Sequence, residues 1–217
     1  IAESIHKYGP DYGFTNTGNE FDYATLRKNR EAYIDRARSS YDGSFKRNGV
    51  DLIEGRAEFV DAHTVRVNGE LIHAKHIVIA TGAHPHIPAI PGAELGGSSD
   101  DVFAWEELPE SVAILGAGYI AVELAGVLHT LGVQTDLFVR RERPLRGFDS
   151  YIVESLVQEM ENTGLNLHTH KVPAKLEETE QGITIHFEDG STHTASQVIW
   201  ATGRRPNVEG LQLEKAG

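Results

Sequence analysis

The sequence of 217 residues contains no cysteine, and its only methionine is Met160. Without cysteine, these residues can form no disulfide, ligate no metal through sulfur and supply no catalytic thiol. The chain begins with Ile1 rather than with methionine. We therefore expect that residues preceding Ile1 have been removed, either from the sequence or by proteolytic maturation.

Long apolar runs and an excess of positive charge are missing as well. No apolar run approaches the roughly 20 residues that a membrane-spanning helix requires, so the sequence predicts no membrane partner. The 32 acidic and 20 basic residues give a net charge of −12, which repels phosphate backbones and disfavours nucleic acid as a partner. With 40% hydrophobic residues, the chain can nevertheless bury a core.

The first part of the chain combines a helical pattern with strand patterns. We expect helix over residues 1–49, most clearly over 23–45, where helix formers are frequent and apolar residues recur on one face. Two alternating stretches and a hairpin turn follow, at 57–60, 64–67 and Asn68-Gly69. The continuous apolar run 76–80 predicts a buried strand.

Three prolines, Pro85, Pro88 and Pro91, force an extended connection in the middle of the chain. We place a domain boundary there, which predicts domains at 1–91 and 92–217. The chain length is consistent with two small domains.

A repeat links the two predicted domains. Gly69 precedes an Ala-Thr-Gly sequence at 80–82, and Gly190 precedes a second one at 201–203 by the same interval. The second domain has a glycine-rich opening well before this repeat, whereas the first has none within the sequence. If the repeat reflects two nucleotide-binding domains of one design, we expect the first opening to lie upstream of Ile1.

The second domain shows a strand–helix alternation that is typical of parallel α/β folds. We expect strands at 112–115, 135–139, 183–187 and 198–200, with a turn at Asp189-Gly190. We expect one helix over 119–131 that ends at Gly132, and another that is capped by Asp149 or Ser150 and runs to about Asn162, before Gly164.

The strand 112–115 runs into Gly116-Ala-Gly-Tyr-Ile-Ala121, a G-x-G-x-x-A pattern that opens a helix. Gly116 permits the tight turn, and Gly118 lets the backbone approach a pyrophosphate. Ala121 lets the helix pack closely against the strand. Because the helix N-terminus supplies N–H groups and partial positive charge for phosphates, this pattern predicts a dinucleotide site.

The end of the next strand indicates which dinucleotide binds. NAD-binding domains usually place an acid there for the ribose 2′-hydroxyl, but Val139 occupies this position. Four arginines follow within seven residues, at Arg140, Arg141, Arg143 and Arg146. Guanidinium groups can hold a 2′-phosphate through paired hydrogen bonds, so we predict NADP(H) over NAD, although Glu142 leaves one acid nearby.

Five stretches of the sequence resemble the glutathione reductase family of flavin-dependent disulfide reductases. They are 116–126, 138–148, 201–207, 8–14 and 30–35. The similarity covers the chain without large gaps. It implies an α/β fold in which a Rossmann-like NADP(H)-binding domain, 92–217, follows an incomplete FAD-binding domain, 1–91.

The resemblance also implies roles for individual residues. The expected NADPH contacts are Gly116, Ala117, Gly118, Tyr119, Ile120, Ala121, Glu123, Arg140, Arg146 and Gly203. The expected FAD contacts are Ala57, Ala80, Thr81 and Gly82, and Tyr41 is the expected contact with the glutathione substrate. In this family, the ring that matches Tyr119 covers the nicotinamide side of the flavin and moves when the cofactor binds.

Several parts of the family pattern are absent from these residues: the redox dithiol, the first glycine motif and the domain with the catalytic histidine. The resemblance implies that the complete enzyme passes hydride from NADPH to FAD, then electrons to the dithiol and to glutathione disulfide. It further implies a cytoplasmic homodimer. Trypanothione reductase, dihydrolipoamide dehydrogenase and a non-catalytic NADP(H)-binding redox sensor are the alternatives.

Two histidine pairs could raise the question of a metal site. His84 and His86 are two residues apart, as are His168 and His170. A metal would need further ligands that the spacing does not provide. We therefore predict that no metal is bound.

Overall fold

The computed structural model describes residues 21–217, so the helix predicted before Phe21 and the stretch 8–14 lie outside the described residues. Contacts group the described chain into a large unit, Pro85–Arg204 together with residues 21–24, and a small unit, which combines Thr25–His84 with Arg205–Gly217. The domain limits 1–91 and 92–217 remain a prediction.

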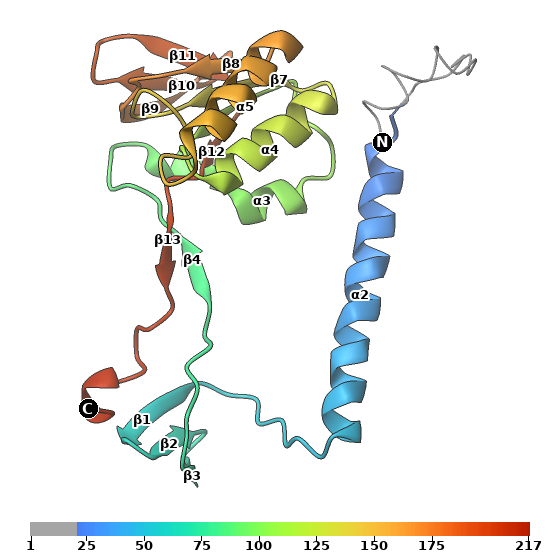
Figure 1. The fold of residues 1–217 in the computed structure, drawn as a ribbon, viewed down its shortest axis with the longest axis vertical. Helices are drawn as coiled ribbons and strands as arrows, with labels where there is room; N and C mark the ends of the chain where they lie inside the picture. The colour runs from blue at the N-terminus through green and yellow to red at the C-terminus, as the bar shows by residue number, and fades with distance from the viewer. Residues whose placement is uncertain (1–20) are drawn as a thin grey trace. The chain divides into compact units, whose positions relative to one another are not determined.

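A parallel sheet of five strands forms the centre of the large unit (Figure 1). Its strands, in spatial order, are β5 (Gly97–Ser98), β12 (Gln197–Trp200), β6 (Ser111–Leu115), β7 (Gln134–Phe138) and β8 (Asn166–His168). Strands that are buried on both faces need continuous apolar sequence, which explains why β6, β7 and β12 could be predicted. The predictions at 112–115, 135–139 and 198–200 are confirmed.

Helices cover one face of this sheet and a second sheet covers the other. The helices are α3 (Ser99–Ala104), α4 (Tyr119–Thr130) and α5 (Ser150–Thr163). Val112 and Ile114 of β6 pack in the core cluster with α4, whereas Ala113 and Leu115 pack in the cluster with the second sheet. Alternate residues of one strand therefore serve two cores, as the pleat requires.

Local signals set the helix ends. The Asp149 carboxylate accepts hydrogen bonds from the backbone N–H groups of Tyr151 and Ile152, at 3.0 and 3.4 Å. Gly132 and Gly164 have φ of 91° and 83°, a conformation that favours glycine. The predicted cap and both predicted ends are confirmed.

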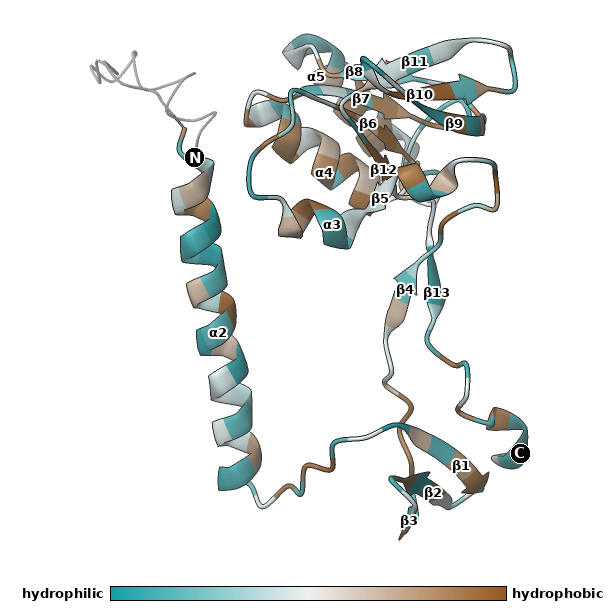
Figure 2. Cartoon of the chain, turned by 180° about the vertical axis from the view of Figure 1, so that it is seen from behind, coloured by the Kyte–Doolittle hydropathy of each residue, from teal (hydrophilic) through white to brown (hydrophobic). Residues whose placement is uncertain are grey.

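The second sheet of the large unit is antiparallel, with β10 (Gly182–Phe187) between β9 (Pro173–Thr179) and β11 (Thr192–Ala195). Figure 2 shows the hydrophobic colouring concentrated where this sheet and the parallel sheet face each other. The strand 183–187 and the turn at Asp189-Gly190 are confirmed. Strands β8 and β9 carry few apolar residues and were not predicted.

The small unit contains nearly all of one long α-helix and a three-stranded antiparallel sheet. The helix is α2 (Tyr23–Arg47), and the strands are β1 (Ala57–Asp61), β2 (Thr64–Val67) and β3 (Glu70–His73). Asn68 and Gly69 form the predicted hairpin turn with φ of 52° and 88°. The helix predicted over 23–45 is also confirmed, but α2 buries none of its residues.

The prediction of a buried strand at 76–80 is wrong. No sheet of the described residues includes this run, and Val78 is 86% exposed. A strand depends on hydrogen bonds from its neighbours, and no described strand lies beside these residues to supply them. The apolar composition therefore did not determine strand structure here.

The C-terminal residues belong to the small unit. Strand β13 (Arg204–Pro206) pairs with β4 (Ala83–Pro85), and the N–H of Phe59 donates to the carbonyl of Leu211 at 2.8 Å. The short helix η3 (Leu213–Lys215) contacts β1. No helix in the described part of the chain is both long and apolar enough to cross a membrane.

Candidate functional site

The glycine turn between β6 and α4 has the geometry that its sequence predicts. A Cβ at Gly116 would lie 2.6 Å from the carbonyl carbon of Ala201 and closer still to its oxygen, so only glycine fits. Ala121 is fully buried where α4 crosses the sheet. Gly118 is the N-cap of α4, and a Cβ there would meet no protein atom within 4 Å. The backbone at Gly118 therefore faces open space, where a ligand can approach the helix N-terminus.

The turn lies where the order of the sheet reverses. From β6, the chain passes through α4 to β7 on one side, whereas β12 lies on the other side of β6. In open α/β sheets, ligands bind at such a point, outside the carboxyl ends of the strands.

Two clefts adjoin the turn. The first, here called the arginine cleft, has a volume of about 420 Å³, and its lining includes Gly116, Ala117, Phe138, Arg140, Lys171 and Thr202. The second, here called the tyrosine cleft, has a volume of about 210 Å³, and its lining includes Gly118, Tyr119, Ile120, Gly203 and Arg204. The two clefts give the turn room for a ligand on both sides.

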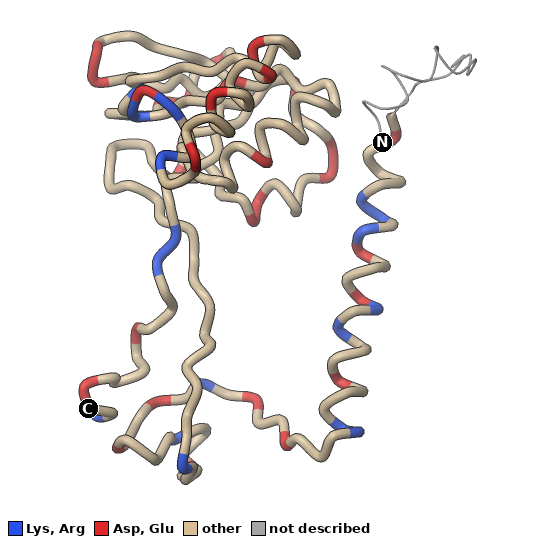
Figure 3. Tube along the Cα trace, in the orientation of Figure 1, with Lys and Arg blue, Asp and Glu red and all other residues tan. Residues whose placement is uncertain are grey.

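Positive charge in the large unit gathers near this turn. The segment Pro85–Arg204 contains 18 acidic residues but only seven Lys and Arg. In Figure 3, the blue segments of this unit lie together near the loop that follows β7, whereas the red segments are dispersed. The seven are Arg140, Arg141, Arg143, Arg146, Lys171, Lys175 and Arg204. Concentrated positive charge in an acidic unit favours an anionic ligand at this place.

The loop after β7 is tied to the glycine turn. The N–H of Leu145 donates to the carbonyl of Ala117 at 2.7 Å, and Pro144 is fully buried. These contacts hold the loop while the side chains of Arg140 and Arg146 stay exposed. Exposed guanidinium groups on an anchored loop can reach a phosphate without disturbing the core.

The structure brings together most, but not all, of the residues predicted for NADPH. Seven of the ten predicted residues line one of the two clefts: Gly116, Ala117, Gly118, Tyr119, Ile120, Arg140 and Gly203. Ala121 lies in the core beneath the turn, and Glu123 is exposed further along α4. Arg146 lines neither cleft and is placed beside the turn by its loop.

Lys171 is a cleft residue that sequence reasoning missed, because the segment after β8 carries no periodic signal. Its ammonium group donates to Asp189 at 2.7 Å and to Ser191 at 2.8 Å. The hydrogen bond from Lys171 holds the pKa of the Asp189 carboxyl well below its ordinary value, with Ser191 acting in the same direction. The lysine is thus fixed at the edge of the arginine cleft.

The small unit has a cleft of its own, with a volume of about 390 Å³. Its lining comprises Ala57 and Thr81, which were predicted to contact FAD, together with Gly55, Arg56, His84, Asn207, Glu209 and Leu211. The Thr81 hydroxyl donates to the carbonyl of Asn207 at 2.6 Å, and the Asn207 side chain donates to the carbonyl of Thr81 at 3.0 Å. The carbonyl of Gly82 accepts from the Asn207 N–H at 2.9 Å.

The remaining predicted residues of the small unit do not join this cleft. Ala80 is exposed outside its lining, and Tyr41 lies on α2 with 66% of its surface exposed. The described part of this unit contains no strand–glycine turn–helix that could hold a pyrophosphate. The described residues of this unit therefore do not complete an FAD site.

The histidine pairs do not converge. His84 bonds to Asn207 at 2.6 Å, and His168 bonds to Asp136 at 2.7 Å. In the described part of the chain, no group of three or more His, Asp or Glu side chains is placed to hold a metal ion.

Known proteins resemble this chain over most of its length. Residues 4–217 match the family described as pyridine nucleotide-disulphide oxidoreductase. The glutathione reductase of Schizosaccharomyces pombe is 42% identical over an alignment of 215 residues that covers 94% of this chain and 46% of that protein. The chloroplastic/mitochondrial glutathione reductase of Pisum sativum is 36% identical over 98% of this chain and 39% of that protein.

A solved structure agrees with the sequence comparisons. The HOCl-induced flavoprotein disulfide reductase RclA from Escherichia coli has a TM-score of 0.83 and 26% identity, over 91% of this chain and 46% of that one. The chain thus spans about half the length of the relatives it matches. The predicted Rossmann-like α/β fold and the resemblance to disulfide reductases are confirmed. This chain belongs to the pyridine nucleotide-disulphide oxidoreductase family.

Proposed function

We propose that this chain binds NADP(H) at the glycine turn between β6 and α4. The observation that carries the proposal is the open backbone at Gly118 beside a cleft lined by Arg140. In this arrangement, the N-terminus of α4 receives the pyrophosphate, and Arg140 and Arg146 hold the 2′-phosphate. The absence of an acid at Val139 supports NADPH over NADH.

The other predicted contacts have supporting roles in this proposal. Ala117, Ile120 and Gly203 line the clefts, and Glu123 follows one turn along α4. Tyr119 is 57% exposed in the tyrosine cleft, where its ring can cover and uncover the nicotinamide side of the site.

We further propose that the segment acts within a longer glutathione-disulfide reductase. FAD, when bound, accepts hydride from NADPH and passes electrons on, and Ala57, Ala80, Thr81 and Gly82 would contact it. The names of the two glutathione reductase relatives support glutathione disulfide as substrate, with Tyr41 as its contact here. A cytoplasmic homodimer without nucleic acid or membrane partners completes the proposal, although the Pisum sativum relative is named as chloroplastic/mitochondrial.

Two related activities remain alternatives. Dihydrolipoamide dehydrogenase should carry an acidic residue just after β7. Val139 occupies this position here, so this alternative is the weaker one. Trypanothione reductase is the second alternative, because the parts of the family pattern that lie outside these 217 residues would distinguish it. A non-catalytic NADP(H)-binding sensor would need no dithiol.

We expect the 217-residue chain alone to show no NADPH oxidation with glutathione disulfide. The reaction needs a thiolate to attack the disulfide, and the chain contains no cysteine. A longer protein that carries this segment and has the length of its relatives should purify yellow and oxidise NADPH with glutathione disulfide. Absorbance at the NADPH band measures both reactions. Turnover by the 217 residues would overturn this proposal, and a yellow but inactive longer protein would favour another electron acceptor.

A further inference from the structure

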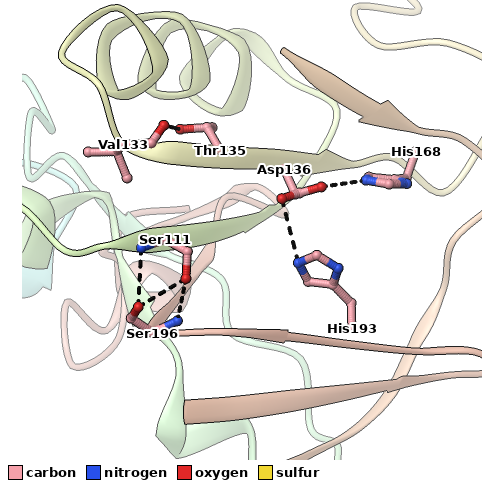
Figure 4. A network of polar contacts seen from close by, with 7 residues as sticks. All are labelled: Ser111, Val133, Thr135, Asp136, His168, His193 and Ser196. Atoms are coloured by element: carbon pink, nitrogen blue, oxygen red, sulfur yellow. Dashed lines mark hydrogen bonds and ion pairs between the residues drawn. The ribbon is translucent and has the colours of Figure 1, made fainter. Parts of the chain in front are cut away.

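A buried carboxylate lies between two histidines in the large unit (Figure 4). Asp136 on β7 has a side chain that is 5% exposed. Its two oxygens face the Nε2 atom of His168 on β8, at 2.7 Å, and the Nε2 atom of His193 on β11, at 3.6 Å. The three residues therefore join the parallel sheet to the antiparallel sheet.

The same histidines surround Phe138. The Phe138 ring stacks on His168 with centroids 4.4 Å apart and planes inclined by 10°, and it meets His193 at 4.9 Å in a tilted geometry. Phe187 of β10 stacks on it at 5.0 Å. With Asp136 two residues before it on the same face of β7, the position of Phe138 depends directly on the carboxylate–histidine contacts.

Strand β7 connects this cluster to the candidate NADP(H) site, because Asp136 and Phe138 lie on β7 and Arg140 follows it. Phe138 and Arg140 are two residues apart, and both line the arginine cleft. The backbone beside them is fixed to the segment after β8, since the N–H of Val139 donates to His168 and the carbonyl of Val139 accepts from Lys171. A change in how Asp136, His168 and His193 pack would therefore move the wall from which Arg140 extends.

His193 is the residue of this cluster whose protonation is linked to its burial. Burial lowers the pKa of the His193 ring below its ordinary value, against the attraction of Asp136 and with a further lowering by His168. The two histidine rings are 6.0 Å apart, so a proton on His193 adds positive charge close to His168 and Asp136. The other charged groups near these rings are Lys171, 5.5 Å from the Phe187 centroid, and its partner Asp189.

We propose that Asp136, His168 and His193 are positioning residues that hold Phe138 and Arg140 for the 2′-phosphate, and that protonation of His193 loosens this arrangement. The inference rests on the proposed NADP(H) site and deepens it. It makes nucleotide affinity depend on pH through residues that do not touch the nucleotide.

The direction of the effect on stability follows from the lowered pKa of His193. Between its folded value and the unfolded value near 6.5, the unfolded chain binds the proton and the folded chain does not. The contribution of neutral His193 to the free energy of unfolding is therefore fully present above about pH 6.5, and it decreases as the pH falls below that value. Acidification should weaken the cluster and the cleft together.

The test compares the full chain with its His193→Gln variant, which keeps a polar side chain but cannot titrate. NADP⁺ is titrated by calorimetry at about pH 7.5 and 5.5. The 2′-phosphate itself gains a proton near pH 6, but it does so equally in both proteins. We expect the wild-type affinity to fall on acidification by about threefold or more beyond the fall in the variant. His186→Gln is the matched control, since the His186 side chain is 39% exposed and bonds to Glu177 outside the cluster, and it should behave as wild type.

Thermal unfolding of the same proteins gives a readout that needs no nucleotide. The midpoint of the wild type should fall more between pH 7.5 and 5.5 than that of His193→Gln. Equal pH dependence of affinity in both proteins would overturn the proposal that protonation of His193 loosens the arrangement. Failure of the wild type to bind NADP⁺ at any pH would overturn the proposed function, and the unfolding data would then decide whether the cluster is proton-linked.

Discussion

Replacing Arg140 by alanine should weaken NADPH binding by roughly 10- to 150-fold and leave NADH binding nearly unchanged. A charge-assisted hydrogen bond contributes about 1.5–3 kcal/mol, and only NADPH offers the 2′-phosphate to which Arg140 would donate. Arg146→Ala should act in the same direction, because its loop is anchored at Ala117 beside the same turn. Fluorescence titration of each variant with both nucleotides measures the effect.

Arg36→Ala is the matched control for the loss of one positive charge, since Arg36 is an exposed residue of α2. Its affinity for both nucleotides should equal that of the wild type. If Arg140→Ala weakened NADPH and NADH equally, the arginine would not distinguish the 2′-phosphate. The NADP(H) assignment would then lose its main support.

Replacing each glycine of the turn by alanine should have a different effect: Gly116→Ala should reduce stability, and Gly118→Ala should reduce nucleotide affinity. Gly116→Ala places a methyl group against the carbonyl of Ala201, and such overpacking typically costs about 1–3 kcal/mol of the free energy of unfolding. Gly118→Ala meets no protein atom and should cost less than about 1 kcal/mol, as a change of helix N-cap. Its methyl group would instead occupy the space that the pyrophosphate needs.

Thermal unfolding and nucleotide titration separate these effects. Gly116→Ala should lower the unfolding midpoint, whereas Gly118→Ala should keep the midpoint and lose affinity for NADPH and NADH alike by about tenfold or more, or about 1.4 kcal/mol. Wild-type affinity in Gly118→Ala would show that no phosphate approaches this backbone.

Sequence reasoning succeeded where the signal is local. The glycine turn, the Asp149 cap and the hairpin at Asn68-Gly69 each depend on a few neighbouring residues, and the structure has all three. The buried strands β6, β7 and β12 were equally clear, because burial on both faces demands apolar residues throughout.

The sequence could not show features that depend on distant partners. Asn207 bonds to Thr81 across 126 residues, and no pattern near either residue predicts that pairing. The run 76–80 has strand composition, but no strand among residues 21–217 pairs with it, so the strand prediction failed. Lys171 and the cluster around Asp136 arise where β7, β8 and β11 meet, which only the folded chain brings together.

The most direct test of the account is the relative affinity of the chain for NADPH and NADH, measured by titration at one fixed salt concentration. If Arg140 and Arg146 hold the 2′-phosphate at the glycine turn, NADPH should bind at least about tenfold more tightly, which corresponds to about 1.4 kcal/mol. Rising salt should reduce this preference, because part of it is electrostatic. Equal affinities, or tighter binding of NADH, would contradict the account.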